Sequence, residues 1–247
     1  MPVYFIQSNS IQNDRIVLTG DLAHHLSAVL RCRAGEIIHL ADEDRVRYQT
    51  ELTQVAENRI VAKILRRERP QSRRTPAVIL AQAVLKGDRM DWAVQKAGEL
   101  GASTIIPVVT ERTIARPDSE RARRQRERWQ MIAKEAAQQC GRSDFSDVTP
   151  VVSLDELFKN PPEASLKIVP WEQEEGRSLK AALHNLSKEK SVAVLIGPEG
   201  GFSSREIEKA RDSGWVSVSL GPRILRAETA GMAVLAILDY ELYSGGN

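Results

Sequence analysis

Cysteine is scarce in this chain, and long apolar runs are missing altogether. The two cysteines, Cys32 and Cys140, stand far apart and form no Cys-x-x-Cys pair, which argues against a disulfide framework and against a zinc site. No apolar run approaches the roughly 18 residues of a membrane-spanning helix, and the opening MPVYFIQSNS has no basic segment followed by an apolar one. We therefore expect a soluble, cytoplasmic protein with no metal.

A strong charge imbalance is also missing. The formal net charge is +2, which by itself says nothing about a nucleic-acid partner. What is present is an ordinary globular composition, with 42% hydrophobic and 28% charged residues in a chain of 247 residues. A chain of this length holds one large domain or two modest ones.

Residues 1–70 have the pattern of a small β-rich domain. Short strand-like runs follow one another between turn formers, and one helix at Asp21–Leu30 interrupts them. Many short strands in so few residues predict a small β-barrel. In the helix, His24 and His25 favour a packing or capping role over metal binding, since no second ligand pair is nearby. The expected strands are Val3–Ile6, Arg15–Leu18, Glu36–Ala41, Val46–Leu52 and Arg59–Leu65.

The segment Arg66–Pro76 is rich in arginine and predicts a linker, whose limits we set at residues 71–77. Such a charge run is usually solvated, and contact with RNA phosphate is an equal alternative. From residue 78 to residue 247, strand-like runs alternate with helical patterns. That alternation predicts an α/β domain with a mainly parallel sheet.

Two β-type runs near the C-terminus, Val192–Ile196 and Val216–Leu220, each end in Gly-Pro before a helical pattern. Such runs suit strands that are buried on both faces of a parallel sheet. Ligands bind at the carboxyl ends of strands in open parallel sheets, so the loops after these runs form the candidate site. A third run, Leu166–Pro170, would wall the same pocket with Trp171 and Glu172 if it neighbours the other two.

The first loop has three glycines, Gly197, Gly200 and Gly201, which let the backbone approach a ligand or adopt positive φ. It lacks the Lys and Ser/Thr of a P-loop, and Glu199 would repel a phosphate, so a cationic or neutral ligand with hydroxyls fits better. Ser203–Glu206 has the spacing of a capping box. The alternative is that the Gly-Pro pairs only turn the chain.

Arginine is concentrated in two places. The second loop has Arg223, Arg226 and Glu228 within six residues, which favours a functional site over a simple turn. Across Glu111–Arg128, seven arginines face four acids and lysine is absent. Arginine is preferred where bidentate phosphate contacts matter, so we favour RNA contact over a merely solvated helix face.

The strings LIGPEGGFSSREI and LGPRILRAETA resemble the RsmE-type methyltransferases, SPOUT-class enzymes that methylate N3 of a uridine in 16S ribosomal RNA. The segments LKGDRMDWAVQKAGELG, QQCGR and HHLSAVLRCRAGE are similar to the same family, so the resemblance runs from about residue 1 to residue 242. It implies S-adenosyl-L-methionine as the cofactor and 16S rRNA, within the small ribosomal subunit, as the partner. It also implies a PUA-like RNA-binding domain, a C-terminal trefoil knot and a homodimer.

In such an enzyme we expect Arg226 to stabilise the negative charge that builds on a uracil carbonyl oxygen. Glu228 or Glu199 would accept the N3 proton or orient Arg226, whereas the simpler alternative is a helix-start ion pair between Arg226 and Glu228. The expected cofactor-binding residues are Val169, Trp171, Ile196, Gly197, Pro198, Glu199, Gly200, Leu220, Gly221, Ile224, Leu225, Arg226, Thr229 and Ala230. The expected RNA contacts are Arg31, Arg33, Lys86, Arg89, Arg112, Arg123 and Arg142, of which the first two are equally suited to helix-end carbonyls.

Three positions depart from the family pattern. Ala227 stands where Thr is usual, Gln138 replaces Glu, and Gly98 replaces Thr or Ser. Two other functions remain open at this point. One is a SPOUT enzyme that methylates a different RNA position, and the other is a non-catalytic ribosome-assembly protein that binds RNA.

Overall fold

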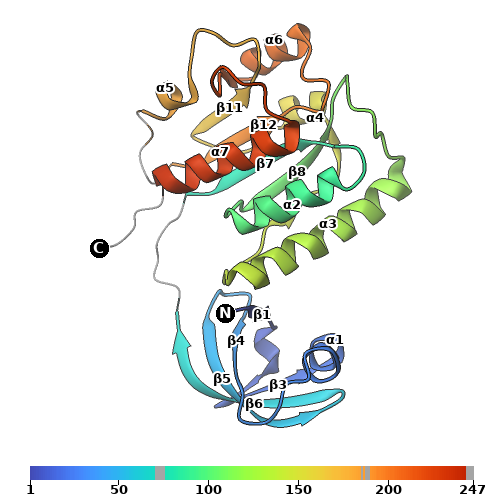
Figure 1. Ribbon diagram of the computed structural model, residues 1–247, viewed down its shortest axis with the longest axis vertical. Helices are drawn as coiled ribbons and strands as arrows, with labels where there is room; N and C mark the ends of the chain where they lie inside the picture. Colours follow the sequence, from blue (N-terminus) through green and yellow to red (C-terminus); the bar gives the residue numbers. More distant parts are fainter. Residues whose placement is uncertain (70–75, 185, 187–189, 243–247) are drawn as a thin grey trace. The chain divides into compact units, whose positions relative to one another are not determined.

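The computed structural model describes residues 1–247 except 70–75, 185, 187–189 and 243–247 (Figure 1). The chain forms two compact units, the first from Met1–Arg73 with Ala137–Phe145 and the second from Arg74–Ala136 with Ser146–Asn247. Most of the expected linker at residues 71–77 lies outside the described residues, so the domain limits stay a prediction.

The first unit is a six-stranded sheet in the order β1-β4-β5-β6-β3-β2, with β1 and β4 parallel and the other ladders antiparallel. Alternate residues face its core, where Ile16, Leu40 and Leu52 are fully buried. Among the described residues no ladder joins β1 to β2, so closure into a barrel stays a prediction. The elements are β1 (Val3–Phe5), the 3-10 helix η1 (Ser8–Ser10), β2 (Ile11–Gln12), β3 (Arg15–Thr19), β4 (Ile37–Ala41), β5 (Arg47–Ala56) and β6 (Arg59–Glu68).

The helix expected in this unit is present but changes its winding halfway. It begins as α1 (Gly20–His24) and continues as the π-helical turn η2 (His25–Val29). In that wider turn the backbone nitrogen of Leu30 donates to the carbonyl oxygen of His25 at 2.9 Å. The helix ends there because the next residue, Arg31, has a positive φ of 56°.

The prediction that Arg66–Pro76 is a linker is wrong for its first three residues. β6 continues through Glu68, pairing Arg66, Arg67 and Glu68 with the start of β5. The Arg67 guanidinium also lies 5.8 Å from the ring centroid of Tyr48. Cross-strand pairing of this kind is a tertiary contact that outweighs the polar composition of the segment.

The second unit contains the parallel sheet that the sequence predicts. Its strand order is β10-β8-β7-β12-β11-β13, β9 pairs with β8, and every ladder is parallel. The strands are β7 (Val78–Ala83), β8 (Thr104–Val109), β9 (Asp147–Val148), β10 (Val152–Ser153), β11 (Leu166–Pro170), β12 (Val192–Ile196) and β13 (Val216–Val218). The helices are α2 (Arg89–Glu99), α3 (Ser119–Cys140), α4 (Leu154–Lys159), α5 (Leu179–Leu183), α6 (Ser204–Asp212) and α7 (Ala227–Leu242).

Helices cover both faces of this sheet, which explains the apolar strand sequences. In β12, Val192, Val194 and Ile196 pack in the core that includes residues of α2, α3 and α7. Ala193 and Leu195 belong to the opposite core, which includes residues of α4 and α6. A central strand buried on both faces must be apolar at every position, not at alternate ones.

Gly98 allows α2 and α3 to approach closely. A Cβ atom at this position would lie 3.1 Å from the Cβ of Ala136 and 3.3 Å from the carbonyl oxygen of Ala133. A hydroxyl-bearing side chain would need the two helices to separate. The departure of Gly98 from the family pattern therefore has a packing reason.

The sequence of helix α7 is apolar nearly all round, yet some of its apolar side chains are buried and others are exposed. Val234 and Leu238 are fully buried against the sheet, whereas Ile237 is 42% exposed and Tyr240 is 82% exposed. The helix ends at Leu242, and Tyr243 lies outside the described residues. No helix in the described part of the chain is long and apolar enough to cross a membrane.

Candidate functional site

The carboxyl ends of three strands meet at one edge of the second unit's sheet, as the sequence predicts. β11 lies between β12 and β13, with Ile168 opposite both Val194 and Val216. β13 ends at Val218, earlier than expected, because Ser219 leaves the ladder and bridges to Ser178. The loops after these strands and the start of α7 therefore surround a common space.

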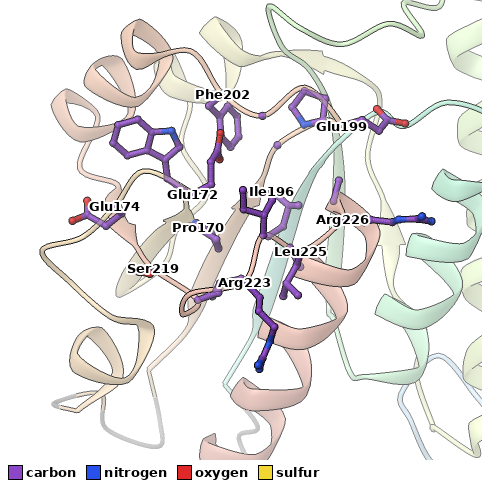
Figure 2. Close-up of a pocket in the computed structure, with 18 of the residues that line it drawn as sticks. Pro170, Glu172, Glu174, Ile196, Glu199, Phe202, Ser219, Arg223, Leu225 and Arg226 are labelled. Atoms are coloured by element: carbon purple, nitrogen blue, oxygen red, sulfur yellow. The ribbon is translucent and has the colours of Figure 1, made fainter.

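That space is a cavity of about 840 Å³ (Figure 2). Its charged lining residues are Arg89, Glu172, Glu174, Glu175, Glu199, Arg223, Arg226 and Glu228. Its other lining residues are Pro170, Trp171, Ile196, Gly197, Pro198, Gly200, Gly201, Phe202, Ser219, Leu220, Gly221, Pro222, Ile224, Leu225, Ala227 and Ala230. The mixture of apolar side chains, glycines and carboxylates suits an organic ligand with polar and cationic groups.

Two of the glycines after β12 are required by close contacts. Gly201 has a φ of +67°, and a Cβ there would lie 2.6 Å from Oε1 of Glu172. At Gly197, a Cβ would lie 3.0 Å from Cε2 of the Phe202 ring. Gly201 thus lies directly against Glu172, which follows β11, and Gly197 lies against the ring of Phe202 in the same loop, so a side chain at either position would require these neighbours to move.

The predicted capping box at the start of α6 is confirmed, and it reaches beyond its own helix. The backbone nitrogen of Glu206 donates to Oγ of Ser203 at 3.3 Å, and the backbone nitrogen of Ser203 donates to Oε2 of Glu206 at 2.9 Å. The other carboxylate oxygen, Oε1 of Glu206, accepts a 2.8 Å hydrogen bond from the backbone nitrogen of Glu111. The loop after β8 is thereby fastened to the glycine-rich loop.

Three further hydrogen bonds hold the glycine-rich loop after β12 in place. Oε1 of Glu199 accepts hydrogen bonds from the backbone nitrogen of Lys86 at 3.1 Å and from Nη1 of Arg89 at 3.3 Å. Nη1 of Arg112 donates to the carbonyl oxygen of Gly200 at 2.9 Å. Arg89 and Arg112, expected as RNA contacts, therefore support the loop from the adjoining β7–α2 and β8–α3 connections.

Arg226 and Glu228 lie at the start of α7 and line the cavity. Arg226 is exposed, and no ion pair between these two side chains is found among the described residues. Oε2 of Glu228 is buried and has no hydrogen-bond partner within the described structure. Within the described structure the helix-start ion pair is therefore absent, and the two side chains lie at the cavity without pairing to each other.

The opposite side of the cavity is formed by Trp171 and Glu174, which follow β11. Oε2 of Glu174 accepts a 3.0 Å hydrogen bond from Nη2 of Arg211 and another from the hydroxyl of Ser217. The hydrogen bond from Ser217 is the main cause that lowers the pKa of the Glu174 carboxyl, with smaller contributions from Gly176 and Arg211. Glu174 therefore stays ionised within this network.

Twelve of the fourteen expected cofactor-binding residues line the cavity. The exceptions are Val169, whose side chain is fully buried in the core beside α4 and α6, and Thr229, which lies within α7. Sequence reasoning missed Glu174, Glu175, Phe202, Ser219, Pro222 and Ala227 as wall residues, whereas Pro170, Glu172, Gly201 and Arg223 belong to the strand end and loops that it expected to form the pocket. Most of the missed residues lie at the ends of the predicted strands or in the loops that follow them, which was the available signal.

The remaining expected RNA contacts are not among the residues that line the cavity. Arg31 and Arg33 are exposed in the first unit. Nη1 of Arg123 lies 2.7 Å from Oε1 of Glu127, and Arg142 pairs with Asp144, so both arginines have acidic neighbours. The arginine-rich helix face is therefore partly neutralised by its own acids.

Comparison with known proteins agrees with this architecture. A family model for an RNA methyltransferase domain matches residues 72–239, and one for an RNA methyltransferase PUA domain matches residues 18–65. "Ribosomal RNA small subunit methyltransferase E" of Bacillus subtilis is 32% identical over 98% of this chain and 97% of the relative. The protein of the same name from Synechocystis is 31% identical over 93% of this chain and 74% of the relative.

A solved structure leads to the same family. The ribosomal RNA small subunit methyltransferase E of Neisseria gonorrhoeae, bound to S-adenosyl methionine, superposes with a TM-score of 0.84 at 31% identity, and the match covers 97% of both chains. The family models, the curated relatives and the solved structure agree on both parts of the chain. The chain therefore belongs to the RNA methyltransferase family that includes the ribosomal RNA small subunit methyltransferase E proteins.

Proposed function

We propose that this protein transfers a methyl group from S-adenosylmethionine to N3 of a uridine in 16S RNA of the small ribosomal subunit. The observation that carries the proposal is the cavity of about 840 Å³ at the carboxyl ends of β11, β12 and β13. The resemblance of LIGPEGGFSSREI and LGPRILRAETA to the RsmE-type enzymes supports the choice of target atom. The names of the relatives support the small-subunit RNA as substrate.

The cavity residues fit this cofactor chemically. Ile196, Leu220 and Leu225 offer apolar surface for a flat adenine ring. Gly197 and Gly201 bring backbone to the wall where a Cβ would collide with existing side chains. Five carboxylates and three arginines line the cavity, so its net charge favours a ligand that carries a positive charge.

The chief contribution of the protein to the reaction is to orient the two reactants. S-adenosylmethionine supplies, when bound, an electrophilic methyl group on a positively charged sulfur. Holding two reactants in line supplies roughly 7–11 kcal/mol of a reaction barrier, whereas a general base adds roughly 10²–10⁴-fold in rate. The contacts from Glu206 to Glu111, from Arg112 to Gly200 and from Lys86 to Glu199 hold the glycine-rich loop rigid enough for that task.

Arg226 and Glu228 have complementary roles in the proposal. The exposed guanidinium of Arg226 donates to a uracil carbonyl oxygen as negative charge builds there. The carboxylate of Glu228, whose Oε2 has no hydrogen-bond partner in the described structure, accepts the N3 proton. Glu199 is less suited to that step because Lys86 and Arg89 already donate to its Oε1.

RNA binding in the proposal uses cations on both parts of the chain. Arg31 and Arg33 are exposed on the unit that matches the PUA domain model, and positively charged groups of this kind contact phosphate. Lys86 stands beside the loop of the cofactor cavity. Because the proposed substrate is RNA of the small ribosomal subunit, the proposal also places this protein in the cytoplasm.

A homodimer and a trefoil knot complete the proposal. The exposed Tyr240 and Ile237 of α7 support the homodimer, since apolar side chains on a helix surface are typical of subunit interfaces. The knot would involve the loops that follow β12 and β13, and it rests on the family resemblance. Light scattering after size-exclusion chromatography tests the dimer, and a mass of one chain, 27.5 kDa, would contradict it.

The function is tested by incubating the protein and labelled S-adenosylmethionine with small ribosomal subunits from cells that lack it. We expect label in 16S RNA and one new primer-extension stop at a uridine, because a methyl on N3 blocks base pairing. Naked 16S RNA serves as a parallel substrate. Label at a different nucleotide would indicate another RNA methyltransferase. Cofactor binding without any label would indicate a non-catalytic RNA-binding protein.

A further inference from the structure

The indole of Trp171 forms part of the cofactor cavity, yet its own nitrogen does not hold it there. Nε1 of Trp171 is buried and has no hydrogen-bond partner in the described part of the chain. The polar group that contacts the ring is the guanidinium of Arg211, whose Cζ lies 5.6 Å from a ring centroid of Trp171. A cation above an aromatic face is attracted by the ring's electrons, so this contact restrains the indole.

Arg211 is itself held by two acceptors from different elements. Its Nη2 donates to Oε2 of Glu174 at 3.0 Å and to Oγ of Ser217 at 2.9 Å, and its Nε donates to the same Oγ at 3.2 Å. The Ser217 hydroxyl donates to Glu174 in turn. One guanidinium therefore links α6, β13 and the loop after β11, which only the planar fork of arginine can do.

The network returns to Trp171 through the backbone. The backbone nitrogen of Glu174 donates to the carbonyl oxygen of Trp171 at 3.1 Å, and the backbone nitrogen of Gly176 donates to Oε1 of Glu174 at 2.9 Å. The carboxylate of Glu174 is only 12% exposed, whereas the side chain of Arg211 is 48% exposed. The loop and its indole are thus anchored to a largely buried carboxylate.

We propose that Arg211 is a positioning residue that holds Trp171 and Glu174 as a preformed wall of the cofactor cavity. The inference rests on the proposed binding of S-adenosylmethionine in that cavity. Arg211 does not line the cavity, so its effect passes through Trp171 and Glu174. In Figure 2, Glu174 and Arg226 lie on opposite sides of the cavity, so the network acts on cofactor binding and leaves the chemistry at Arg226 unchanged.

The test is the affinity of the full-length Arg211→Met variant for S-adenosylmethionine, measured by isothermal titration calorimetry. Ordering one side chain on binding lowers affinity by about two- to tenfold, so we expect the dissociation constant to rise by that factor. KM for S-adenosylmethionine should rise in parallel with kcat unchanged. Arg205→Met is the matched control, since Arg205 is an exposed arginine of the same helix outside the cavity wall.

Two further variants separate positioning from a general loss of structure. Arg211→Lys keeps the charge but lacks the fork, so we expect an intermediate affinity. In a Trp171→Ala background, Arg211→Met should cause a smaller additional loss of affinity than in the wild-type background, because one of the two groups that Arg211 positions is already gone. A fall in kcat at unchanged KM would instead indicate a smaller fraction of folded enzyme, and it would overturn the inference.

The outcome for the wild-type protein distinguishes this inference from the proposed function. If the wild-type protein bound no S-adenosylmethionine, the proposed function would fail together with the inference. If the wild-type protein and Arg211→Met bound the cofactor equally well, the inference alone would fail. Equal losses of cofactor affinity in Arg211→Met and Arg205→Met would mean that the effect comes from the charge of α6. That result would also overturn the inference.

Discussion

The backbone nitrogen of Lys86 donates a 3.1 Å hydrogen bond to Oε1 of Glu199, which joins the loop after β7 to the loop after β12. Arg89 donates to the same oxygen from its Nη1 at 3.3 Å. A carboxylate so occupied orients two loops and is poorly placed to take a proton from a substrate. This contact is the reason that the proposal gives the proton to Glu228 and not to Glu199, a choice that the sequence alone left open.

Replacing Glu199 with Gln should be tolerated. The amide oxygen of Gln can still accept from Lys86 and Arg89, so we expect kcat to fall by less than about tenfold. Methyl transfer to small subunits, measured across pH, checks this prediction. A loss of about a hundredfold or more would mean that Glu199 is the proton acceptor after all.

Replacing Glu228 with Gln should have a much larger effect. In this variant the side chain, whose Oε2 has no hydrogen-bond partner in the described structure, would no longer carry the charge that accepts a proton. We expect kcat to fall by about 10²–10⁴-fold, the range typical of a lost general base, with the S-adenosylmethionine dissociation constant nearly unchanged. Raising the pH should partly restore the variant, since solvent then removes the N3 proton. A variant with wild-type turnover would exclude this role.

Arg226→Ala tests stabilisation of the developing charge. Loss of a single oxyanion donor costs about 10²–10³ in kcat, and we expect a fall of that size. Single-turnover methyl transfer measures this fall in rate, and calorimetry with S-adenosylmethionine measures cofactor binding separately. Arg226→Lys is the conservative control, which should retain part of the activity because it keeps the charge. Full turnover in Arg226→Ala would contradict the assignment.

Gly201→Ala should weaken cofactor binding more than backbone strain alone explains. Alanine at a φ of +67° costs about 1–2 kcal/mol, and its Cβ would also collide with Oε1 of Glu172 at 2.6 Å. Gly20→Ala is a matched control, because Gly20 has a φ of +64° and nothing lies within 4 Å of its added Cβ.

The measurements on the Gly201 variants are thermal melting and cofactor affinity. We expect both glycine variants to lose stability, and only Gly201→Ala to lose affinity. Adding Glu172→Ala to Gly201→Ala should recover part of the stability, since the colliding carboxylate is removed. Without such recovery, the contact between Gly201 and Glu172 would not be the cause.

Tyr48 should make the first unit sensitive to alkaline pH. Burial, followed by the hydrogen bond that its hydroxyl donates to Oδ2 of Asp42 at 2.7 Å, raises the pKa of Tyr48 to about 12. In an unfolded chain the pKa is about 10. The stabilisation is therefore complete below about pH 10 and is lost as the pH rises toward 12, to a limit of roughly 2–3 kcal/mol.

Urea unfolding of the wild-type protein and Tyr48→Phe between pH 8 and about pH 11.5 measures this effect. The variant lacks the hydrogen bond to Asp42, so it should be less stable by about 1–2 kcal/mol at pH 8. Its stability should decline less steeply above about pH 10. Parallel declines in the two proteins would show that Tyr48 does not titrate with unfolding.

Periodicity and turn signals were sufficient for the second unit. The runs at Val192–Ile196 and Leu166–Pro170 are strands with the expected limits, and their carboxyl ends meet at the cavity. These signals are local because they lie within a few consecutive residues. A short run that is apolar at every position is typical of a strand that is buried on both faces of a parallel sheet. The sequence therefore determined the class of fold, the loops that form the site and, through the long motifs, the family.

Only the tertiary structure decided what individual side chains do. Arg112 supports Gly200, Arg123 pairs with Glu127, and Arg211 reaches Trp171, although all three are arginines in polar surroundings of the sequence. Their partners come from other strands and loops or from the next turn of the helix. A guanidinium finds its acceptor in space and not along the chain, so composition predicts its charge while the fold determines its role.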